Sequence, residues 1–227
     1  ACTSLVVKAH QANNAHVFTW NGSAYTGPTT QDPPGNGLVW GAVAGDFNGD
    51  GAMDFITDRE TNGGLVAQIF MGACASDQFT VTNVTGDGRG FTFSSLEDLH
   101  GVGDVDQDGD LDVFGVNYAD GAGRVWLNAG DGLNWTAVPS AFALLSWDPA
   151  DGNTRESASF PARDVTGDGL PDIVECSNQA SGNTSCTIHT GSGTGTFTAG
   201  ATFTLNRLAN SVIGGDFNGD GAPDFLG

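Results

Sequence analysis

The chain has 227 residues and a formal net charge of −20 at pH 7, from 27 Asp and Glu against 7 Lys and Arg. Such a charge repels nucleic acids and anionic membrane surfaces, so both are excluded as expected partners. Hydrophobic residues make up 39% of the chain, enough to bury a core, and no apolar run of about 18 residues predicts membrane insertion.

Along the chain, one segment type recurs: a strand, a Gly-rich turn, and an aromatic residue followed by Thr. It occurs first at residues 16–26 (HVFTWNGSAYT) and returns at 67–80, 123–136 and 186–198. The runs are short and bounded by glycine, so we predict strands and no amphipathic helix. The 35 glycines have no collagen period and fit a β-rich fold with many turns.

A second element alternates with the first. The pattern D-x-[DNT]-x-D-G-x-x-D stands between short apolar runs at residues 46–54, 104–112, 164–172 and 216–224, and its starts are 58, 60 and 52 residues apart. A period of this size indicates a repeat architecture. We therefore predict an all-β fold, a β-propeller of four-stranded antiparallel blades, with residues 1–227 forming a single domain and four repeats in this chain.

The two ends complement each other. Residues 16–26 lack a preceding loop, whereas the chain ends after the fourth loop and its apolar run, 225–227. We expect the N- and C-terminal segments to share one blade, because a circular arrangement leaves no open sheet edge. Three assemblies stay open: a four-bladed ring, half of a larger ring that a homodimer completes, and a fragment of a longer propeller.

The loops predict Ca²⁺ sites. Side chains at positions 1, 3 and 5 alternate and can point inward, a glycine bends the chain at position 6, position 7 offers a carbonyl and position 9 a carboxylate. Cys and His are absent from these positions, which disfavours softer metals. The loops hold 14 of the 27 acidic residues, which without a cation would repel one another or take up protons. The alternative is a solvated hairpin turn, which four in-phase copies disfavour.

The predicted ligands of up to four Ca²⁺ ions share these five positions. They are Asp46, Asn48, Asp50, Ala52 and Asp54; Asp104, Asp106, Asp108, Asp110 and Asp112; Asp164, Thr166, Asp168, Leu170 and Asp172; and Asp216, Asn218, Asp220, Ala222 and Asp224.

The loops differ from an EF-hand, which needs flanking helices and a Glu at position 12. Only the third loop has that residue, Glu175, and it stands in an apolar, strand-like run. We therefore expect a strand–loop–strand site that the Asp at position 9 closes.

Together, the loop, its period and the N-x-G-x-G turn before an aromatic residue, clearest at Asn128, resemble the FG-GAP/VCBS repeats of integrin-type and lectin-type β-propellers. The resemblance covers the whole chain. It implies a propeller with calcium in the loops that join the strands of each blade. Members of the family include integrin α heads, a fungal N-acetylglucosamine-binding lectin, and propeller parts of secreted polysaccharide lyases and of bacterial surface proteins.

Ligand binding is expected where the repeats differ. The longest spacer between an aromatic–Thr pair and the next loop contains Trp147, Asp148, Asp151 and Arg155. An apolar ring beside planar polar groups suits a sugar; the alternative is a Trp that caps a blade core. Trp40 has no counterpart in the other repeats and is a second candidate, although we favour a core position for it, as we do for Trp126 and Trp135.

The four cysteines allow three pairings. Cys176 and Cys186 flank a short polar segment, as neighbours across a hairpin would, so we predict this disulfide and, by elimination, one between Cys2 and Cys74. Four free thiols are the alternative. Disulfides would indicate an oxidising setting, extracellular or periplasmic.

These observations predict a secreted or cell-surface, calcium-stabilised module that binds glycans or glycoproteins. We favour binding over catalysis, because a site present in every repeat resembles scaffolding and no G-x-S-x-G nucleophile motif occurs. The first alternative is a propeller-type polysaccharide lyase or another extracellular enzyme that uses His100, Arg155 or Trp147. A protein-adhesion module is the second.

Overall fold

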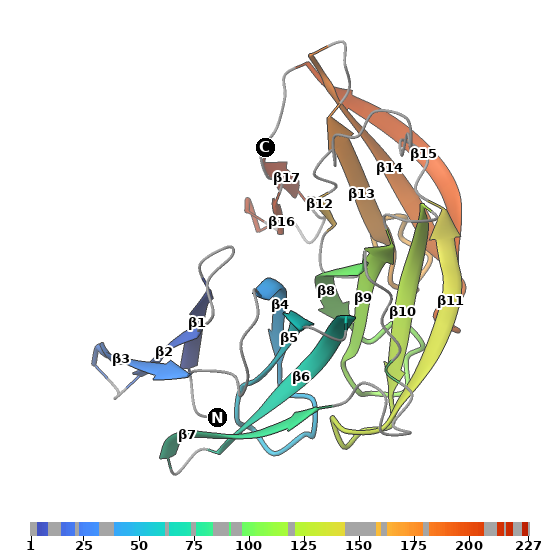
Figure 1. The fold of residues 1–227 in the computed structure, drawn as a ribbon. Coiled ribbons are helices and arrows are strands. Elements are labelled where there is room, and N and C mark those ends of the chain that lie inside the picture. Colours follow the sequence, from blue (N-terminus) through green and yellow to red (C-terminus); the bar gives the residue numbers. More distant parts are fainter. Residues whose placement is uncertain are drawn as a thin grey trace. The chain divides into compact units, whose positions relative to one another are not determined.

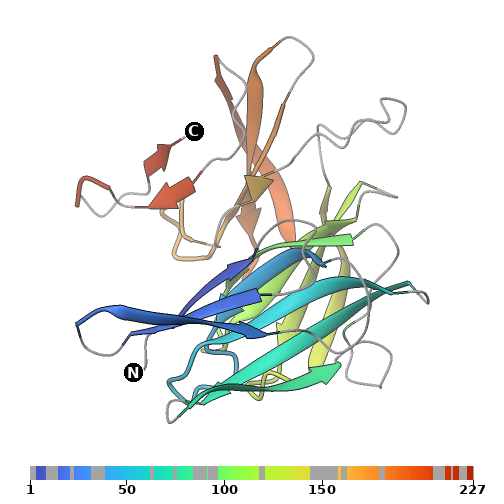
Figure 2. The same cartoon turned by 60° about the vertical axis from the view of Figure 1, so that its left-hand side comes forward.

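The structure is a computed structural model. It describes residues 4–8, 15–20, 23–31, 39–61, 64–73, 76–83, 91, 97–117, 121–143, 158–159, 163–178, 182–206, 213–215, 217–219 and 224–226. These residues form strands and loops and no helix (Figures 1 and 2). Accordingly, nothing in this part of the chain is a helix long and apolar enough to cross a membrane.

Three antiparallel sheets of four strands confirm the predicted repeat unit. Their strand orders are β4-β5-β6-β7, β11-β10-β9-β8 and β12-β13-β14-β15. The strands are β4 Val39–Gly45, β5 Asp54–Thr61, β6 Gly64–Ala73 and β7 Ser76–Asn83; β8 Glu97–Gly103, β9 Asp112–Asn117, β10 Ala122–Asn128 and β11 Trp135–Ala143; and β12 Ala158–Ser159, β13 Ile173–Asn178, β14 Thr184–Gly191 and β15 Phe197–Leu205.

The terminal segments form two smaller sheets. The first has the order β1-β2-β3, with β1 Ser4–Lys8, β2 Ala15–Trp20 and β3 Tyr25–Gln31, and the second pairs β16 Ile213–Gly215 with β17 Asp224–Leu226. A shared terminal blade stays a prediction, because these described strands belong to separate sheets and number five, not four.

The chain divides into two compact units. The first comprises residues 1–99 and 128–137, and the second comprises residues 100–127 and 138–227.

Aromatic rings fill the core of the first unit. Phe55 of β5 stacks on Phe70 of β6 with ring centroids 4.2 Å apart, and the ring of Phe79 lies edge-on to Phe55 at 5.1 Å. Trp135, predicted to be a core residue, is buried and lies edge-on to Phe47 at 5.8 Å and to Phe91 at 5.3 Å. The first loop is thereby anchored, because Phe47 is its second residue.

The second unit has an aliphatic and aromatic core from two sheets. Phe114 and Val125 pack with Phe142, Ile173 and Phe197 in one buried cluster. Trp126 is also buried, as predicted.

A second cluster of the same unit contains the disulfide between Cys176 and Cys186. The two cysteines are cross-strand partners in β13 and β14, so the hairpin interpretation of this pair is confirmed. Cys2 and Cys74 lie outside the described residues.

Candidate metal-binding loops

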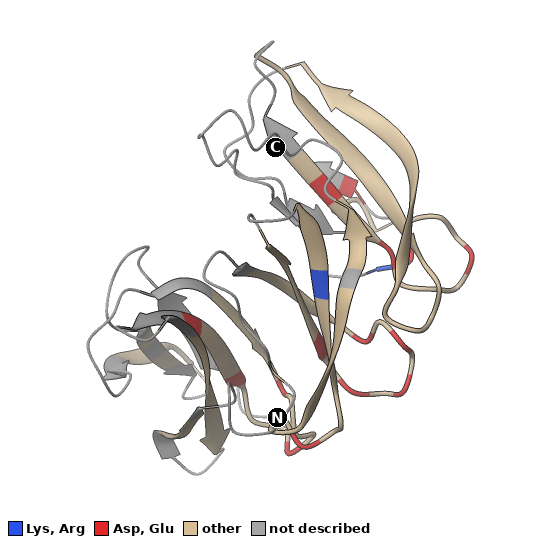
Figure 3. Cartoon of the chain, turned by 45° about the vertical axis from the view of Figure 1, so that its right-hand side comes forward, with Lys and Arg blue, Asp and Glu red and all other residues tan. Residues whose placement is uncertain are grey.

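Each acidic loop connects the first two strands of a sheet. In the first loop the flanking residues Gly45 and Asp54 pair across β4 and β5, and Arg163 and Asp172 pair in the same way around the third loop. Acidic residues concentrate in such loops in Figure 3, where Lys and Arg are sparse. The chain therefore brings carboxylates together in turns that the sheets hold in place.

The Asp at position 9 binds the backbone with both carboxylate oxygens. Asp54 Oδ2 accepts the N–H of Phe47 at 3.0 Å, and its Oδ1 accepts the N–H of Gly72 at 2.7 Å. Asp172 repeats this arrangement with the N–H groups of Val165 at 2.8 Å and Gly191 at 3.0 Å. The carboxylate thus joins the start of the loop to the end of the third strand; we call this arrangement the carboxylate clamp.

In the other two loops, the hydrogen bond between the position-9 carboxylate and the second residue of the loop is also present. Asp112 accepts the N–H of Val105 at 2.9 Å, and Asp224 accepts the N–H of Phe217 at 2.9 Å. Sequence reasoning assigned these aspartates to the cation alone and missed their role in holding the backbone.

Glycine is required where the clamp meets the third strand. A Cβ on Gly72 would lie 2.3 Å from the carbonyl oxygen of Met53, and one on Gly191 would lie 2.0 Å from that of Pro171. Real Cβ atoms do not approach a carbonyl this closely, so a side chain at either position would push the strand away from the clamp.

Burial of the clamp carboxylate disfavours its charged form. The carboxyl group of Asp54 is fully buried, and this desolvation raises its pKa to about 6. The negative charges of Asp50 and Asp46 also raise the pKa, while the hydrogen bonds from Gly72 and Phe47 oppose the rise. A nearby cation would favour the ionised form.

In the first loop, backbone groups already satisfy the carboxylates at positions 1 and 5. Asp46 accepts the N–H of Asp50 at 3.1 Å and that of Gly51 at 2.8 Å, and Asp50 accepts the N–H of Ala52 at 2.7 Å. Asn48 also donates its side-chain amide to Asp50 at 3.1 Å.

The third loop has the same internal bonding. Asp164 accepts N–H groups from Gly167 at 2.6 Å and from Gly169 at 2.9 Å, and Asp168 accepts the N–H of Leu170 at 2.9 Å.

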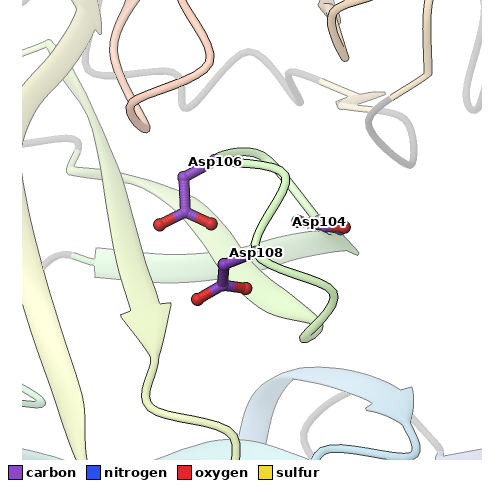
Figure 4. Close-up of side chains that lie close together, drawn as sticks. All are labelled: Asp104, Asp106 and Asp108. Carbon is purple, nitrogen blue, oxygen red and sulfur yellow. The ribbon is translucent and has the colours of Figure 1, made fainter.

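The second loop repeats these bonds, because Asp104 accepts the N–H of Gly109 at 3.2 Å and Asp108 accepts that of Asp110 at 3.0 Å. It differs in holding five aspartates where the first and third loops each hold three. Carboxylate oxygens of Asp104, Asp106 and Asp108 lie within 4.8 Å of one another, and Figure 4 shows the three side chains on this loop. Oδ1 of Asp104 and Oδ1 of Asp106 are both buried and lack a hydrogen-bond partner. Buried oxygens without a donor are costly, so these atoms are free to bind a cation of the hard, oxygen-preferring kind.

Electrostatics supports this difference. Desolvation raises the pKa of Asp106, the charges of Asp108 and Asp104 raise it further, and a hydrogen bond from the backbone of Asp108 opposes the rise. The second loop is thus the one where a cation would relieve both repulsion and unmet hydrogen bonding. In the fourth loop, Asp216, Asp220 and Ala222 lie outside the described residues.

Several other predicted residues cannot be placed. Trp147, Asp148, Asp151 and Arg155 lie outside the described residues, and so does the side chain of Trp40. Of the three residues proposed for the lyase alternative, only His100 is among the described residues, and it is partly exposed. Trp147 and Arg155 are not described.

Glu175 agrees with the expectation that the third loop is not an EF-hand. It stands in β13 and its carboxylate contacts the buried ring of His189 at 3.1 Å. Its strand position and this contact are those of a core residue, not of a twelfth-position ligand.

The Asn128 turn has a role that the sequence did not reveal. The side-chain amide of Asn128 donates to the carbonyl oxygen of Phe47 at 2.7 Å, and its oxygen accepts the N–H of Gly132 at 3.0 Å. Asn128 therefore ties this turn to the first acidic loop. The turn motif in the sequence pointed to Asn128, but its partner Phe47 is 81 residues away in the chain.

Comparisons with known proteins agree with this architecture. The model of the FG-GAP-like repeat family matches residues 5–57 and 164–227, about half of the chain. No curated protein matches this chain. Among solved structures, the chain is similar to a lectin from Agrocybe aegerita described as recognising non-reducing terminal N-acetylglucosamine, with a TM-score of 0.52 and 21% identity. The match covers 85% of this chain and 48% of the lectin chain, so this chain spans about half that length, and a likeness at this identity shows the fold alone.

We expect Asp172→Asn to lower the free energy of unfolding by about 1–3 kcal/mol. The amide keeps one acceptor but turns a donor toward a buried N–H that the carboxylate satisfied. Urea unfolding in a chelating buffer measures this. Asp168→Asn, at an exposed position of the same loop, is the matched control and should change stability by no more than about 0.5 kcal/mol. Equal effects of both variants would contradict the clamp.

Proposed function

Because the chain belongs to the FG-GAP-like repeat family, we propose that it is an extracellular, calcium-stabilised module that binds carbohydrate. The observation that carries the calcium part is the second loop, where Asp104 and Asp106 each keep a buried oxygen without a partner. Five aspartates in nine residues are otherwise hard to reconcile with a stable fold.

In this proposal Ca²⁺ is held by positions 1, 3 and 5 of each loop, with the carbonyl at position 7 and the clamp carboxylate at position 9. The ion contributes two positive charges to each loop and binds only the folded arrangement, so it stabilises the fold. Extracellular calcium is abundant, and the disulfide between Cys176 and Cys186 also favours that compartment.

Carbohydrate binding rests on fold likeness to the lectin and on the composition of the spacer around Trp147. Because a fold can carry many functions, the residues of that spacer are the ones that would determine carbohydrate binding.

Assembly is a further part of this proposal. Phe217, the second residue of the fourth loop, is 52% exposed, whereas Phe47 and Val105 at the same position are each 1% exposed. In the first loop, Trp135 of the following repeat covers this position. We propose that the corresponding turn of a second copy covers Phe217, which makes the larger ring a homodimer.

We expect the melting temperature to be higher in Ca²⁺ than in EDTA, by about 5–10 °C for each Ca²⁺ site. This holds when the free Ca²⁺ concentration is about 100 times the Kd of the site, because binding then stabilises the folded state by about 2.7 kcal/mol. Differential scanning calorimetry tests this. Asp104→Asn combined with Asp106→Asn should remove one bound ion by native mass spectrometry. Asp131→Asn, in an Asp-Gly turn outside the acidic loops, is the control and should leave the number unchanged. An identical melting curve with and without EDTA would refute the calcium sites.

A glycan array in Ca²⁺ should show binding that EDTA abolishes, and probes ending in N-acetylglucosamine are the first to examine. Trp147→Ala should remove the signal, because a sugar loses its stacking face. Tyr25→Ala alters an exposed aromatic elsewhere in the chain and should retain binding. Absence of binding to every glycan would refute the proposal, and release of unsaturated products from uronate polymers would favour the lyase.

Light scattering with size-exclusion chromatography should give twice the mass of one chain for the wild type and one chain mass for Phe217→Ser. Phe217→Leu keeps an apolar surface and should remain dimeric. A monomeric wild-type protein would rule out the dimer.

A further inference from the structure

Gln107 has a backbone conformation that its residue type disfavours. It stands at position 4 of the second acidic loop with φ = 63°, and among the described residues it is the only non-glycine residue with positive φ. The other three loops have glycine there: Gly49, Gly167 and Gly219, with φ of 70°, 80° and 77°. A side chain in this region is strained, whereas glycine is not.

The side chain of Gln107 makes a long-range hydrogen bond. Its Nε2 donates to the carbonyl oxygen of Gly169 in the third loop at 2.7 Å, across 62 residues of sequence. Both residues are exposed. A solvent-exposed hydrogen bond between neutral groups contributes little net stability, of the same order as the strain it would have to offset. Stability alone therefore does not explain Gln at this position.

Gln107 and its partner Gly169 both lie next to predicted cation ligands, which points to a role in the binding sites. Gly169 donates its N–H to Asp164 at 2.9 Å, and the peptide unit whose carbonyl Gln107 binds also donates the N–H of Leu170 to Asp168 at 2.9 Å. Gln107 thus holds the peptide that precedes Leu170, whose carbonyl is the predicted seventh-position ligand. In its own loop, Gln107 stands between Asp106 and Asp108, two of the clustered carboxylates.

We propose that Gln107 is a positioning residue that couples cation binding in the second and third loops. A cation held by Asp106 and Asp108 fixes the backbone of Gln107, and its amide then holds Gly169 in the orientation that the third loop needs. This inference rests on the proposed calcium sites. Because coupling between two sites is reciprocal, occupancy of the third loop also strengthens binding in the second.

Glycine-selective ¹⁵N labelling lets each loop report its own cation. During a Ca²⁺ titration, the amides of Gly167 and Gly169 follow the third loop, Gly109 follows the second, and Gly49 follows the first. Gln107→Met keeps the side-chain length and the strain but loses the donor, and Gln107→Gly loses both the donor and the strain.

In both variants we expect the third loop to bind Ca²⁺ about five-fold or more weakly, the lower end of typical coupling, with the affinity of the first loop unchanged. Asp106→Asn should weaken the third loop to a similar degree, and adding Gln107→Met to it should cause no further loss. That non-additive result separates coupling from general destabilisation.

Two results would overturn the inference, and they differ. Third-loop affinity that stays constant in Gln107→Met and Gln107→Gly would reject the coupling while leaving the calcium sites intact. Glycine amides that do not respond to Ca²⁺ in any loop would reject the calcium sites and the coupling together.

Discussion

The structure depends on a buried carboxylate that binds two separated parts of the backbone. At position 9 of the acidic loop, one oxygen accepts an N–H from the loop and the other accepts an N–H from the end of the third strand, as Asp54 and Asp172 show. A charged acceptor makes stronger hydrogen bonds than a neutral one. One side chain therefore sets the geometry of the turn and attaches it to the sheet, and the strand must carry glycine at the contact.

With the clamp in place, the other loop positions can vary. In each of the first three loops, backbone N–H groups bind the carboxylates at positions 1 and 5. In the second loop, one oxygen each of Asp104 and Asp106, the Oδ1 atom, is nevertheless buried without a hydrogen-bond partner. The repeats thus share a scaffold but differ in electrostatics, and the clearest difference between neighbouring loops is also where Gln107 replaces glycine.

Much of the fold could be predicted from the chain. The apolar residues after each loop indicated strands, and residues 54–61, 112–117 and 173–178 form them as β5, β9 and β13. The strand context of Glu175 argued against an EF-hand, and its contact with His189 agrees. Those predictions succeeded because they depend on local periodicity and on a motif repeated in phase.

The bonds that distinguish one repeat from another could not be predicted in this way. Asn128 was visible as a motif residue, yet its bond to Phe47 spans 81 residues, and the bond from Gln107 to Gly169 spans 62. Gln107 looked like an unremarkable variation within the loop pattern. No local rule links these pairs, because packing between sheets brings them together.

By itself, the sequence determined the repeat period, the four-stranded sheets, the composition of the acidic loops and the hairpin disulfide. These features follow from residue spacing and side-chain type within a few turns of chain. Only the tertiary structure decided which carboxylate oxygens are occupied by backbone donors and which are left without one. The reason is that the donors at Gly72 and Gly191 lie 18 and 19 residues beyond the carboxylates they bind, and the sheet must fold before they meet.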